Sequence, residues 1–398
     1  MKKYIFLMIG LLTSFAMWAQ EVDETTLNNR DYLVDRNDGE GTAYFSVWND
    51  GISFTSDIAR IPETITDESN SITYTIIGVR NLHFGSNLEM KIYLPNTATT
   101  ISPEDPWDNY NRIQGVKTLV LSSSIEAVNN LHLSSVQKFE VDENNPDFSA
   151  DDDGVLFSKD KKTLYYAPYG SMSKSVFVHY DIPQEVETIG KCAFSRFDAT
   201  TRFTAKGQLH TVSERAFQYC RNLTDFIFEN NSLTTIGIYA FERCGRLSNF
   251  DSDNTTLSII GECAFEECSS LSEFKFTDAI TRIENYAFRW TNLYLSEFTL
   301  PANLAFVGYE AFNSRHIEKL IIPASLKNNI RYFDNGIFAY GSITSVYSYI
   351  QDPYPINDIF WDCSVGKIYI PKGETSNYAS TDGWRDSNYE ESTNLLPA

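Results

Sequence analysis

The sequence predicts a solenoid, in which a parallel β-strand ladder and short helical or 3-10 turns repeat in coils of about 23-24 residues. Ala-Phe pairs recur along the chain, an apolar residue stands five positions before each phenylalanine, and a short alternating apolar segment follows it. One such unit cannot bury its own apolar side, so neighbouring units must stack. Stacking places equivalent residues about 4.8 Å apart in a parallel ladder.

The repeat is anchored on phenylalanines separated by 23, 24, 24, 23, 24 and 26 residues. These anchors are Phe194, Phe217, Phe241, Phe265, Phe288, Phe312 and Phe338. Four residues before several anchors stand Gly190, Gly237, Gly261 and Gly308. Each of these glycines indicates a turn that needs either a positive φ or a close approach between backbones.

Short segments with period-two alternation follow the anchors and predict strands with one buried face. They are LTDFIF at 223–228, LSEFKF at 271–276, LSEFTLP at 295–301 and IEKLIIP at 317–323. The expected core of the regular coils includes Ile236, Phe241, Phe250, Ile260, Phe265, Leu271 and Phe274.

The chain divides into five segments by composition and by regularity of the repeat. Residues 1–19 carry two lysines, an apolar run and small residues, which predicts a signal peptide. The others are an N-terminal β-rich cap at 20–74, degenerate repeats with an acidic hairpin at 75–181, regular repeats at 182–350 and a C-terminal cap at 351–398. Terminal coils must cover an exposed core edge, so divergence at both ends is expected.

We expect export through the signal peptide, to the cell surface, the periplasm or the medium. No second apolar stretch is long enough to span a bilayer, and no cysteine suited to a lipid anchor precedes Cys192. The formal net charge of -21 disfavours nucleic acid as a partner, because an acidic chain repels polyanions.

Three cysteines, Cys220, Cys244 and Cys268, lie three residues past their anchors and 24 residues apart. They suggest disulfides, a metal ladder or a column of buried thiols. Stacked Cβ atoms about 4.8 Å apart exceed the disulfide preference of about 3.8 Å, and zinc needs converging ligands. The spacing therefore favours buried thiols that act as small hydrophobic groups.

Residues 149–160, SADDDGVLFSKD, resemble part of a calcium loop, with Asp151, Asp153 and Asp160 at the third, fifth and twelfth places. Ser149 takes the first place, and the bidentate glutamate is missing. An acidic hairpin turn is the favoured interpretation, with calcium as a weak candidate. No other metal and no cofactor is expected.

Catalytic motifs are absent from the sequence, which predicts a protein that is not an enzyme. There is no H-E-x-x-H, no G-x-S-x-G and no phosphate-binding glycine loop. The five histidines share no repeated position; they are His83, His132, His179, His210 and His316.

Two files of side chains flank the buried strand positions and are expected to point outward. The first file is Asp225, Asn249, Glu273, Glu297, Lys319 and Ser345. The second is Ile227, Asp251, Lys275, Thr299, Ile321 and Tyr347. They form either a solvated face or a rigid binding surface, acidic in its first half and apolar and aromatic in its last coils.

The repeat form Ile-Gly-x-x-Ala-Phe-x-x-Cys-x-x-Leu resembles the BspA-like leucine-rich repeats of bacterial surface proteins. The segments from N-N-P-D-F to D-G-V-L-F and IYIPKGETSNYASTDGW are similar to segments of that family. The resemblance covers roughly residues 75–390. It implies a leucine-rich-repeat solenoid with an adhesion or other binding role at the cell envelope, and it supplies no catalytic residues.

We therefore expect an exported, monomeric, non-enzymatic binding or adhesion module. Its exposed strand ladder would recognise a host or cell-envelope protein through Asp225, Asn249, Asp251, Glu273, Lys275, Glu297, Thr299, Lys319, Ile321 and Tyr347. The alternative is a carbohydrate-binding protein, because sugar rings stack on exposed aromatic side chains such as Tyr347, Tyr354 and Trp361.

Overall fold

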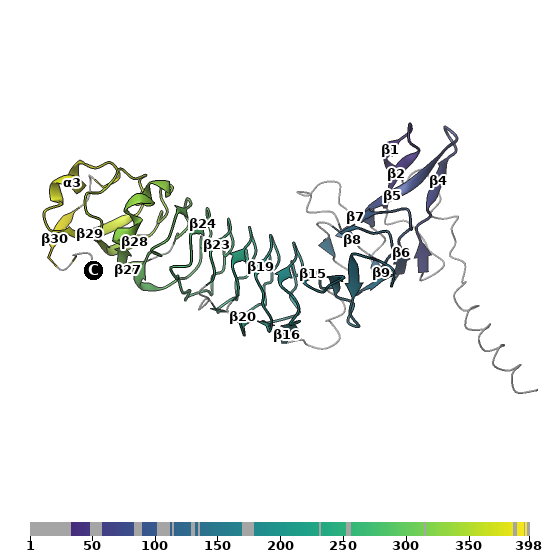
Figure 1. The fold of residues 1–398 in the computed structure, drawn as a ribbon, viewed down its shortest axis with the longest axis horizontal. Helices are drawn as coiled ribbons and strands as arrows, with labels where there is room; N and C mark the ends of the chain where they lie inside the picture. Colours follow the sequence, from purple (N-terminus) through teal and green to yellow (C-terminus); the bar gives the residue numbers. More distant parts are fainter. Residues whose placement is uncertain are drawn as a thin grey trace, which may run out of the picture. The chain divides into compact units, whose positions relative to one another are not determined.

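The computed structural model describes two compact units, Met1–Gly154 and Val155–Ala398, called unit 1 and unit 2 (Figure 1). The described residues are 33–47, 58–82, 90–101, 112–113, 115–128, 132–133, 136–168, 179–230, 232–251, 256–313, 316–384, 388–393 and 395. The predicted signal peptide, residues 1–19, lies outside them.

Unit 1 combines parallel ladders with two antiparallel hairpins. One sheet joins β1 (Leu33–Asn37), β2 (Thr42–Val47), β5 (Ile72–Leu82), β7 (Thr100–Ile101) and β10 (Ala127–Val128), with β4 (Thr64–Asp67) paired to β5. A second, all parallel, joins β3 (Ile58–Arg60), β6 (Met90–Tyr93), β9 (Val116–Leu121) and β12 (Lys138–Val141). The other strands are β8 (Arg112–Ile113), paired with β11 (His132–Leu133), and β13 (Phe148–Ala150). The hairpins are β1–β2 and β4–β5.

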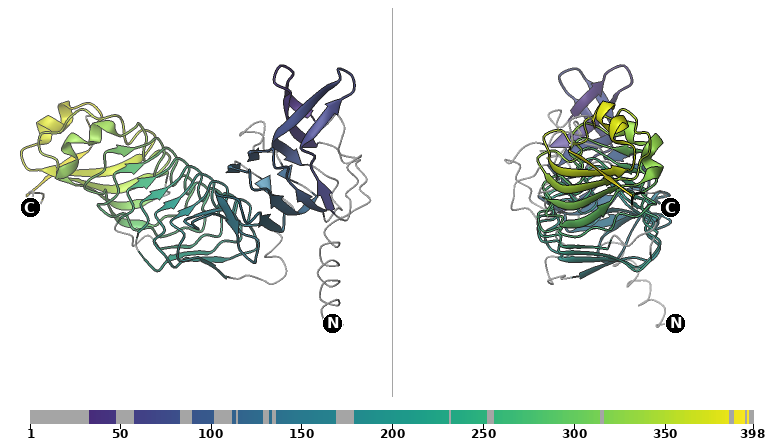
Figure 2. Two further views of the ribbon diagram at one scale, coloured as in Figure 1. Left: turned by 45° about the vertical axis from the view of Figure 1, so that its right-hand side comes forward. Right: turned by 90° about the vertical axis from the view of Figure 1, so that its left-hand side faces the viewer.

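Unit 2 is a parallel β-solenoid with two strand ladders, as its teal and green strands show in Figure 2. The narrow ladder starts from the hairpin of β14 (Leu156–Ser158) and β15 (Thr163–Tyr166). It continues in parallel through β17 (Thr188–Ile189), β19 (Thr211–Val212), β21 (Thr235–Ile236), β23 (Ile259–Ile260), β24 (Arg282–Ile283) and β26 (Phe306–Val307).

The wide ladder has longer strands and forms two sheets. The first contains β16 (His179–Ile182), β18 (Arg202–Ala205), β20 (Asp225–Phe228) and β22 (Asn249–Phe250). The second contains β25 (Leu295–Thr299), β27 (Ile317–Ile322), β28 (Ser342–Ser348), β29 (Ser364–Pro371) and β30 (Tyr389–Ser392). The described part of unit 2 also contains the short helices η2 (Ala324–Asn328), η3 (Ile330–Tyr332) and α3 (Thr375–Ser380). The predicted solenoid of strands and short turns is confirmed.

The strand predicted at 271–276 is wrong, because this segment forms no strand and separates the two sheets of the wide ladder. Its apolar residues still follow the repeat: Leu271 and Phe274 are buried, and Phe274 stacks on Phe250 with ring centroids 5.9 Å apart. Side-chain stacking therefore adds to two backbone bonds, in which the N–H groups of Asn292 and Tyr294 in the next coil donate to the carbonyls of Leu271 and Ser272. The alternating pattern correctly identified which residues are buried. An extended segment that forms no strand shows the same alternation of buried and exposed residues as a strand does.

The core of unit 2 is a continuous stack of the anchor phenylalanines. Phe241 lies 5.1 Å from Phe217 and 5.3 Å from Phe265, with interplanar angles of 2° and 4°. A second file from the wide ladder meets these rings edge to face, as Phe250 does with Phe265 at 5.0 Å. Each ring thus contacts neighbours above, below and beside it, and the core exists only because the coils stack.

The repeated glycines are required by close approach of backbones, not by a positive φ. None of Gly190, Gly237, Gly261 and Gly308 has a positive φ. A Cβ on Gly261 would lie 2.6 Å from the carbonyl carbon of Gly237, and one on Gly308 would lie 2.4 Å from the Asn285 nitrogen. Glycine is needed because adjacent coils touch backbone to backbone at this point.

Among the described residues, positive φ angles fall instead on two positions of the Ala-Phe turns and of the Ile-Phe turn at 337–338. The residues before Ala have φ between 51° and 59°: Cys192, Arg215, Tyr239, Cys263, Tyr286 and Glu310. The residues two after Phe have φ between 59° and 62°: Arg196, Tyr219, Arg243, Glu267, Trp290 and Tyr340. A non-glycine residue in this conformation costs roughly 1–2 kcal/mol, so the fold must supply compensation.

Hydrogen bonds between coils compensate this strain. The backbone N–H groups of Tyr239, Phe241 and Arg243 each donate to a carbonyl of the next coil at 2.8 Å. Their acceptors are the carbonyl oxygens of Glu262, Ala264 and Glu266. Alternate N–H groups of the turn, such as that of Glu242, bond within their own coil. The Ala-Phe turns therefore form a third ladder, although they contain no strand.

The three repeated cysteines are buried thiols. The Sγ atoms of Cys220, Cys244 and Cys268 donate to the carbonyl oxygens of Phe194, Phe217 and Phe241 at 3.0, 3.1 and 3.1 Å. All six cysteines are free, and burial raises the pKa of these three thiols. The thiols thus add one further bond between successive coils.

Phe265→Asp should remove soluble expression or lower the free energy of unfolding by more than about 4 kcal/mol, because it deletes a stacked ring and buries a carboxylate. Phe265 is fully buried between Phe241 and Phe288. Urea unfolding monitored by circular dichroism measures the change. Ser272→Asp, at an exposed position of the same coil, is the matched control. A Phe265→Asp protein as stable as the control would show that the register of the core is wrong.

Gly261→Ala should destabilise unit 2 by about 1–3 kcal/mol, since the new methyl group meets the backbone of the coil before it. Gly245→Ala is the matched control, because its nearest neighbour would be Ser269 Oγ at 3.6 Å. That control should be neutral or stabilising by about 0.4–1 kcal/mol. Thermal unfolding of both variants decides the point, and equal melting temperatures would contradict the close approach of backbones.

Candidate functional site

The predicted binding residues lie on the outward side of the wide ladder, and none of them is buried. The ten are Asp225, Asn249, Asp251, Glu273, Lys275, Glu297, Thr299, Lys319, Ile321 and Tyr347. Pairing aligns Asp225 with Asn249, Glu297 with Lys319, and Ile321 with Tyr347. Glu273 and Lys275 belong to the coil without a strand. The two predicted files are therefore side-chain files along one face.

Most charges near the C-terminal end of this face are paired between coils. Lys319 Nζ lies 2.9 Å from Glu297 Oε2, and this hydrogen bond is the main cause that raises the pKa of Lys319. Lys367 Nζ lies 2.6 Å from Glu390 Oε2 in the same way. By contrast, the carboxylates of Asp251 and Glu273 have no hydrogen bond or ion pair within the described part of the chain.

Ile321, Tyr347 and Tyr369 form a continuous apolar stripe across β27, β28 and β29, called the aromatic stripe. The two tyrosine rings stack with centroids 4.6 Å apart and planes 18° apart. Lys319 Nζ lies 5.0 Å from the centre of the Tyr347 ring. The stripe is thus a half-exposed apolar surface bordered by charge, in a register fixed by the ladder.

The acidic hairpin does not gather metal ligands. Asp160 Oδ1 accepts hydrogen bonds from Ser158 Oγ at 2.6 Å and from the Lys162 backbone at 3.1 Å. These bonds lower the pKa of Asp160 and tie its carboxylate to its own turn. Within the described ranges, no three His, Cys, Asp or Glu side chains converge as the weak calcium candidate of Asp151, Asp153 and Asp160 would require.

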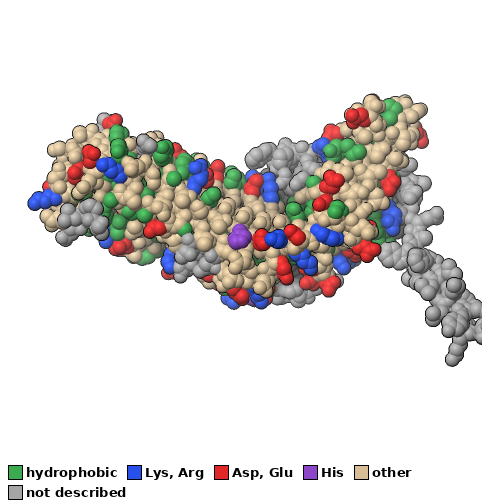
Figure 3. Space-filling view, viewed as in Figure 1, with side chains coloured by type: hydrophobic (Ala, Val, Ile, Leu, Met, Phe, Trp, Pro, Cys, Tyr) green, Lys and Arg blue, Asp and Glu red, His purple; other side chains and the backbone are tan. Residues whose placement is uncertain are grey.

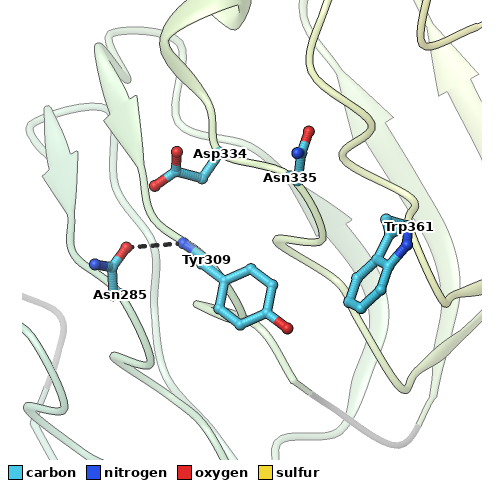
Figure 4. Close-up of a pocket in the computed structure, with 5 residues that line it drawn as sticks. All are labelled: Asn285, Tyr309, Asp334, Asn335 and Trp361. Atoms are coloured by element: carbon cyan, nitrogen blue, oxygen red, sulfur yellow. Dashed lines mark hydrogen bonds between the residues drawn. The ribbon is translucent and has the colours of Figure 1, made fainter.

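A hollow opens in unit 2 beside the Ala-Phe turns, on residues that sequence reasoning largely missed. It has a volume of about 380 Å³ and is lined by Asn285, Tyr309, Asp334, Asn335 and Trp361. Figure 4 shows the Tyr309 ring between Asn285 and Trp361, with Asp334 and Asn335 along another side. We call this the turn hollow.

Gly336 explains why the hollow forms in this coil. It precedes Ile337-Phe338, which takes the place of Ala-Phe in this coil, at a position where preceding coils carry a side chain, and it has φ of 61°. A Cβ there would lie 3.1 Å from the Trp361 ring and 3.4 Å from the Tyr309 ring. The missing side chain leaves room for both rings. The sequence signal was Asp334-Asn335-Gly336 at a place where other coils have no such triplet.

The three aromatic residues expected for carbohydrate binding do not form one patch. Tyr347 belongs to the aromatic stripe, whereas Trp361 lines the turn hollow. Tyr354 is exposed, with Lys327 Nζ 5.4 Å from its ring centre.

Acidic residues also line the turns from inside, where Glu242, Glu266 and Glu310 are buried. Arg289 Nε donates to Glu266 Oε1 at 2.7 Å, and its NH1 lies 3.8 Å from Glu310 Oε2. Glu242 instead accepts a hydrogen bond from Gln218. Burial raises the pKa of Glu242, and repulsion from Glu266 adds to this effect.

Two parallel ladders, a stacked phenylalanine core and a short turn in each coil define a leucine-rich-repeat solenoid. The BspA type leucine rich repeat region matches in 6 copies, over residues 171–294 and 258–381. The chain therefore belongs to the BspA-type leucine-rich-repeat family. No curated protein matches the chain.

The chain is also similar to solved structures of bacterial proteins. The pneumococcal vaccine antigen PcpA is 15% identical, over 91% of this chain and 98% of that chain, with a TM-score of 0.36. A leucine-rich repeat protein from Bacteroides ovatus is 13% identical, over 91% and 99%, with a TM-score of 0.34. A leucine rich cell surface protein from Faecalibacterium prausnitzii is 14% identical, over 87% and 94%, with a TM-score of 0.29.

Among the described residues, no helix has the length and apolar character needed to cross a membrane. On the face shown in Figure 3, acidic and basic side chains are interspersed along the chain.

Glu242→Gln should raise the melting temperature at pH 7.5, because it removes a buried charge and keeps an acceptor for Gln218. The pKa of Glu242 is raised above its ordinary 4.5, so the folded state holds this proton more tightly than the unfolded state. The ionised side chain then costs stability above the raised pKa, and this cost disappears as the pH falls toward 4.5.

The gain in melting temperature should therefore be larger at pH 7.5 than at pH 4.5, as differential scanning fluorimetry can measure. Glu229→Gln, at an exposed position, is the control and should show little difference at either pH. A Glu242→Gln gain that is the same at both pH values would contradict a titrating buried carboxyl group.

Proposed function

We propose that the protein is a non-enzymatic binding module, exported to the cell surface, that recognises a host or cell-envelope protein through the wide ladder of unit 2. The aromatic stripe of Ile321, Tyr347 and Tyr369 carries this proposal. Tyrosine is enriched at protein interfaces, where it combines apolar contact area with a polar hydroxyl group. Membership of the BspA-type family and the predicted signal peptide at residues 1–19 support the surface location.

The ladder makes this face a preorganised surface. Backbone pairing fixes Ile321 opposite Tyr347 and Tyr347 opposite Tyr369, so their side chains are placed before a partner arrives. Binding to such a surface costs less conformational entropy than binding to a mobile loop. Several modest contacts on successive coils can therefore add to a useful affinity.

Charge on the same face favours a partner with a basic surface. Asp251 and Glu273 present carboxylates that no described residue neutralises, in the middle of the ladder. Complementary charge mainly accelerates association and sets its salt dependence. We expect the aromatic stripe to supply most of the affinity, and the acidic middle to supply orientation.

Tyr347→Ala should weaken binding by about 2 kcal/mol or more, because truncating an interface tyrosine removes contact area at the centre of the stripe. The partner is captured by chemical cross-linking to intact host and bacterial cells and then purified. Surface plasmon resonance with the full exported chain measures its affinity. Tyr332→Ala, an exposed tyrosine of η3 outside the wide ladder, is the control and should bind normally. Equal loss in both variants would contradict a site on the wide ladder.

Combined reversal by Glu273→Lys and Glu297→Lys should also weaken binding and change its salt dependence. Asp152→Lys with Asp153→Lys is the matched control, since it makes the same change in net charge on exposed residues of the acidic hairpin. If the hairpin variant loses the partner while the ladder variant keeps it, the hairpin is the binding surface and the proposal fails.

A further inference from the structure

The turn hollow lies away from the wide ladder and presents exposed aromatic rings. Trp361 is 45% exposed and Tyr340 is 59% exposed. The Trp361 ring centre lies 6.2 Å from that of Tyr309 and 6.4 Å from that of Tyr340. Rings at these distances touch one another and form a continuous wall. Contiguous exposed aromatic surface at the edge of a cavity is typical of a ligand-binding groove, whereas a single exposed ring is common.

The polar groups of the hollow offer both hydrogen-bond donors and acceptors. Asn285 Oδ1 accepts from the Tyr309 backbone N–H at 2.9 Å, and Asn335 Oδ1 accepts from that of Asp358 at 2.9 Å. These bonds fix the orientation of both amides, so each must direct its NH2 group elsewhere. Neither NH2 group, nor the Asp334 carboxylate, has a hydrogen bond with another described residue. The residues that line the hollow therefore include two amides whose NH2 groups are unpaired and one unpaired carboxylate acceptor, within the described part of the chain.

This combination favours a ligand with hydroxyl groups. A hydroxyl both donates and accepts, so it can satisfy amide NH2 groups and a carboxylate together. A sugar ring also has apolar C–H faces that suit an aromatic wall. A cationic ligand would gain from Asp334 and from the ring faces, but it would meet the two amide donors with the wrong sign. The volume of about 380 Å³ is within the range of about 300–1,000 Å³ found for small-ligand sites.

We propose that the turn hollow binds a neutral saccharide, with one sugar ring against Trp361 and Tyr309 and its hydroxyl groups on Asn285, Asp334 and Asn335. This site is separate from the protein-binding face of the wide ladder, and it uses different residues. A surface protein with both sites would hold a protein partner and a glycan independently.

The geometry of Gly336 makes the proposal specific to one coil. Every preceding Ala-Phe coil from Cys192 to Glu310 places a side chain at the equivalent left-handed position. Gly336 places none, and the space that a side chain would take lies against the rings of Trp361 and Tyr309. Gly336→Asn should fill the hollow without breaking the turn, because asparagine tolerates a positive φ better than most residues.

Isothermal titration calorimetry of the full exported chain with maltohexaose, cellohexaose, mannohexaose, xylohexaose and fully N-acetylated chitohexaose tests the proposal. At least one of these neutral oligosaccharides should bind, and Trp361→Ala and Gly336→Asn should each weaken that binding by about tenfold or more. Trp290→Ala is the matched control, since Trp290 is 53% exposed at another Ala-Phe turn outside the hollow, and it should bind like the wild type. Circular dichroism checks that each variant is folded.

Failure of all five oligosaccharides to bind would overturn the proposal. So would binding that survives Trp361→Ala, or binding that is lost equally in Trp290→Ala. Trp361→Ala replaces an exposed side chain, so the test holds even if Gly336→Asn does not fold. Titration with tetramethylammonium separates the cationic alternative: binding that is tighter than that of any oligosaccharide and lost in Trp361→Ala would contradict a saccharide site.

Discussion

The stacking of equivalent positions from coil to coil is the constraint on which the rest of unit 2 depends. No coil buries its own phenylalanine: Phe241 is covered by Phe217 and Phe265, and its backbone N–H is satisfied by the coil that follows. The same contact explains why Gly261 has no side chain and why Tyr239 and Arg243 adopt left-handed conformations. The left-handed backbone strain in the turns and the recurring glycines are therefore both consequences of the same contact between successive coils.

This constraint leaves the outward positions free to differ, and the candidate binding surfaces lie there. On the wide ladder, pairing fixes the place of each side chain but not its chemistry, so an acidic middle and an aromatic stripe can share one face. At the turns, tyrosine, arginine and glutamate all occupy the left-handed position before the Ala-Phe pair. Where this position is Gly336, the missing side chain leaves the space of the turn hollow. Function can thus change without any change in the core.

Much of the fold could be predicted from the sequence, because the Phe, Ile and Gly files recur at nearly constant intervals. The segment 271–276 was predicted wrongly as a strand, since alternation reports a buried face and not backbone pairing. The left-handed residues carry no sequence signal, because the side chains of Cys192, Arg215 and Tyr239 differ in size, charge and aromatic character. The turn hollow was missed for a related reason: it joins Asn285 to Trp361 across several coils, and its signal is a side chain that Gly336 lacks.

Hydrogen exchange at the Ala-Phe turns tests the central claim most directly, because these turns contain no strand and yet are predicted to form a ladder between coils. Mass spectrometry with residue-level fragmentation can follow the backbone amides of Tyr239, Phe241 and Arg243, which donate to the next coil at 2.8 Å. We predict that they exchange as slowly as the paired amides of β20 in the wide ladder. Exchange as fast as that of unbonded surface turns would contradict coil-to-coil bonding as the basis of the fold.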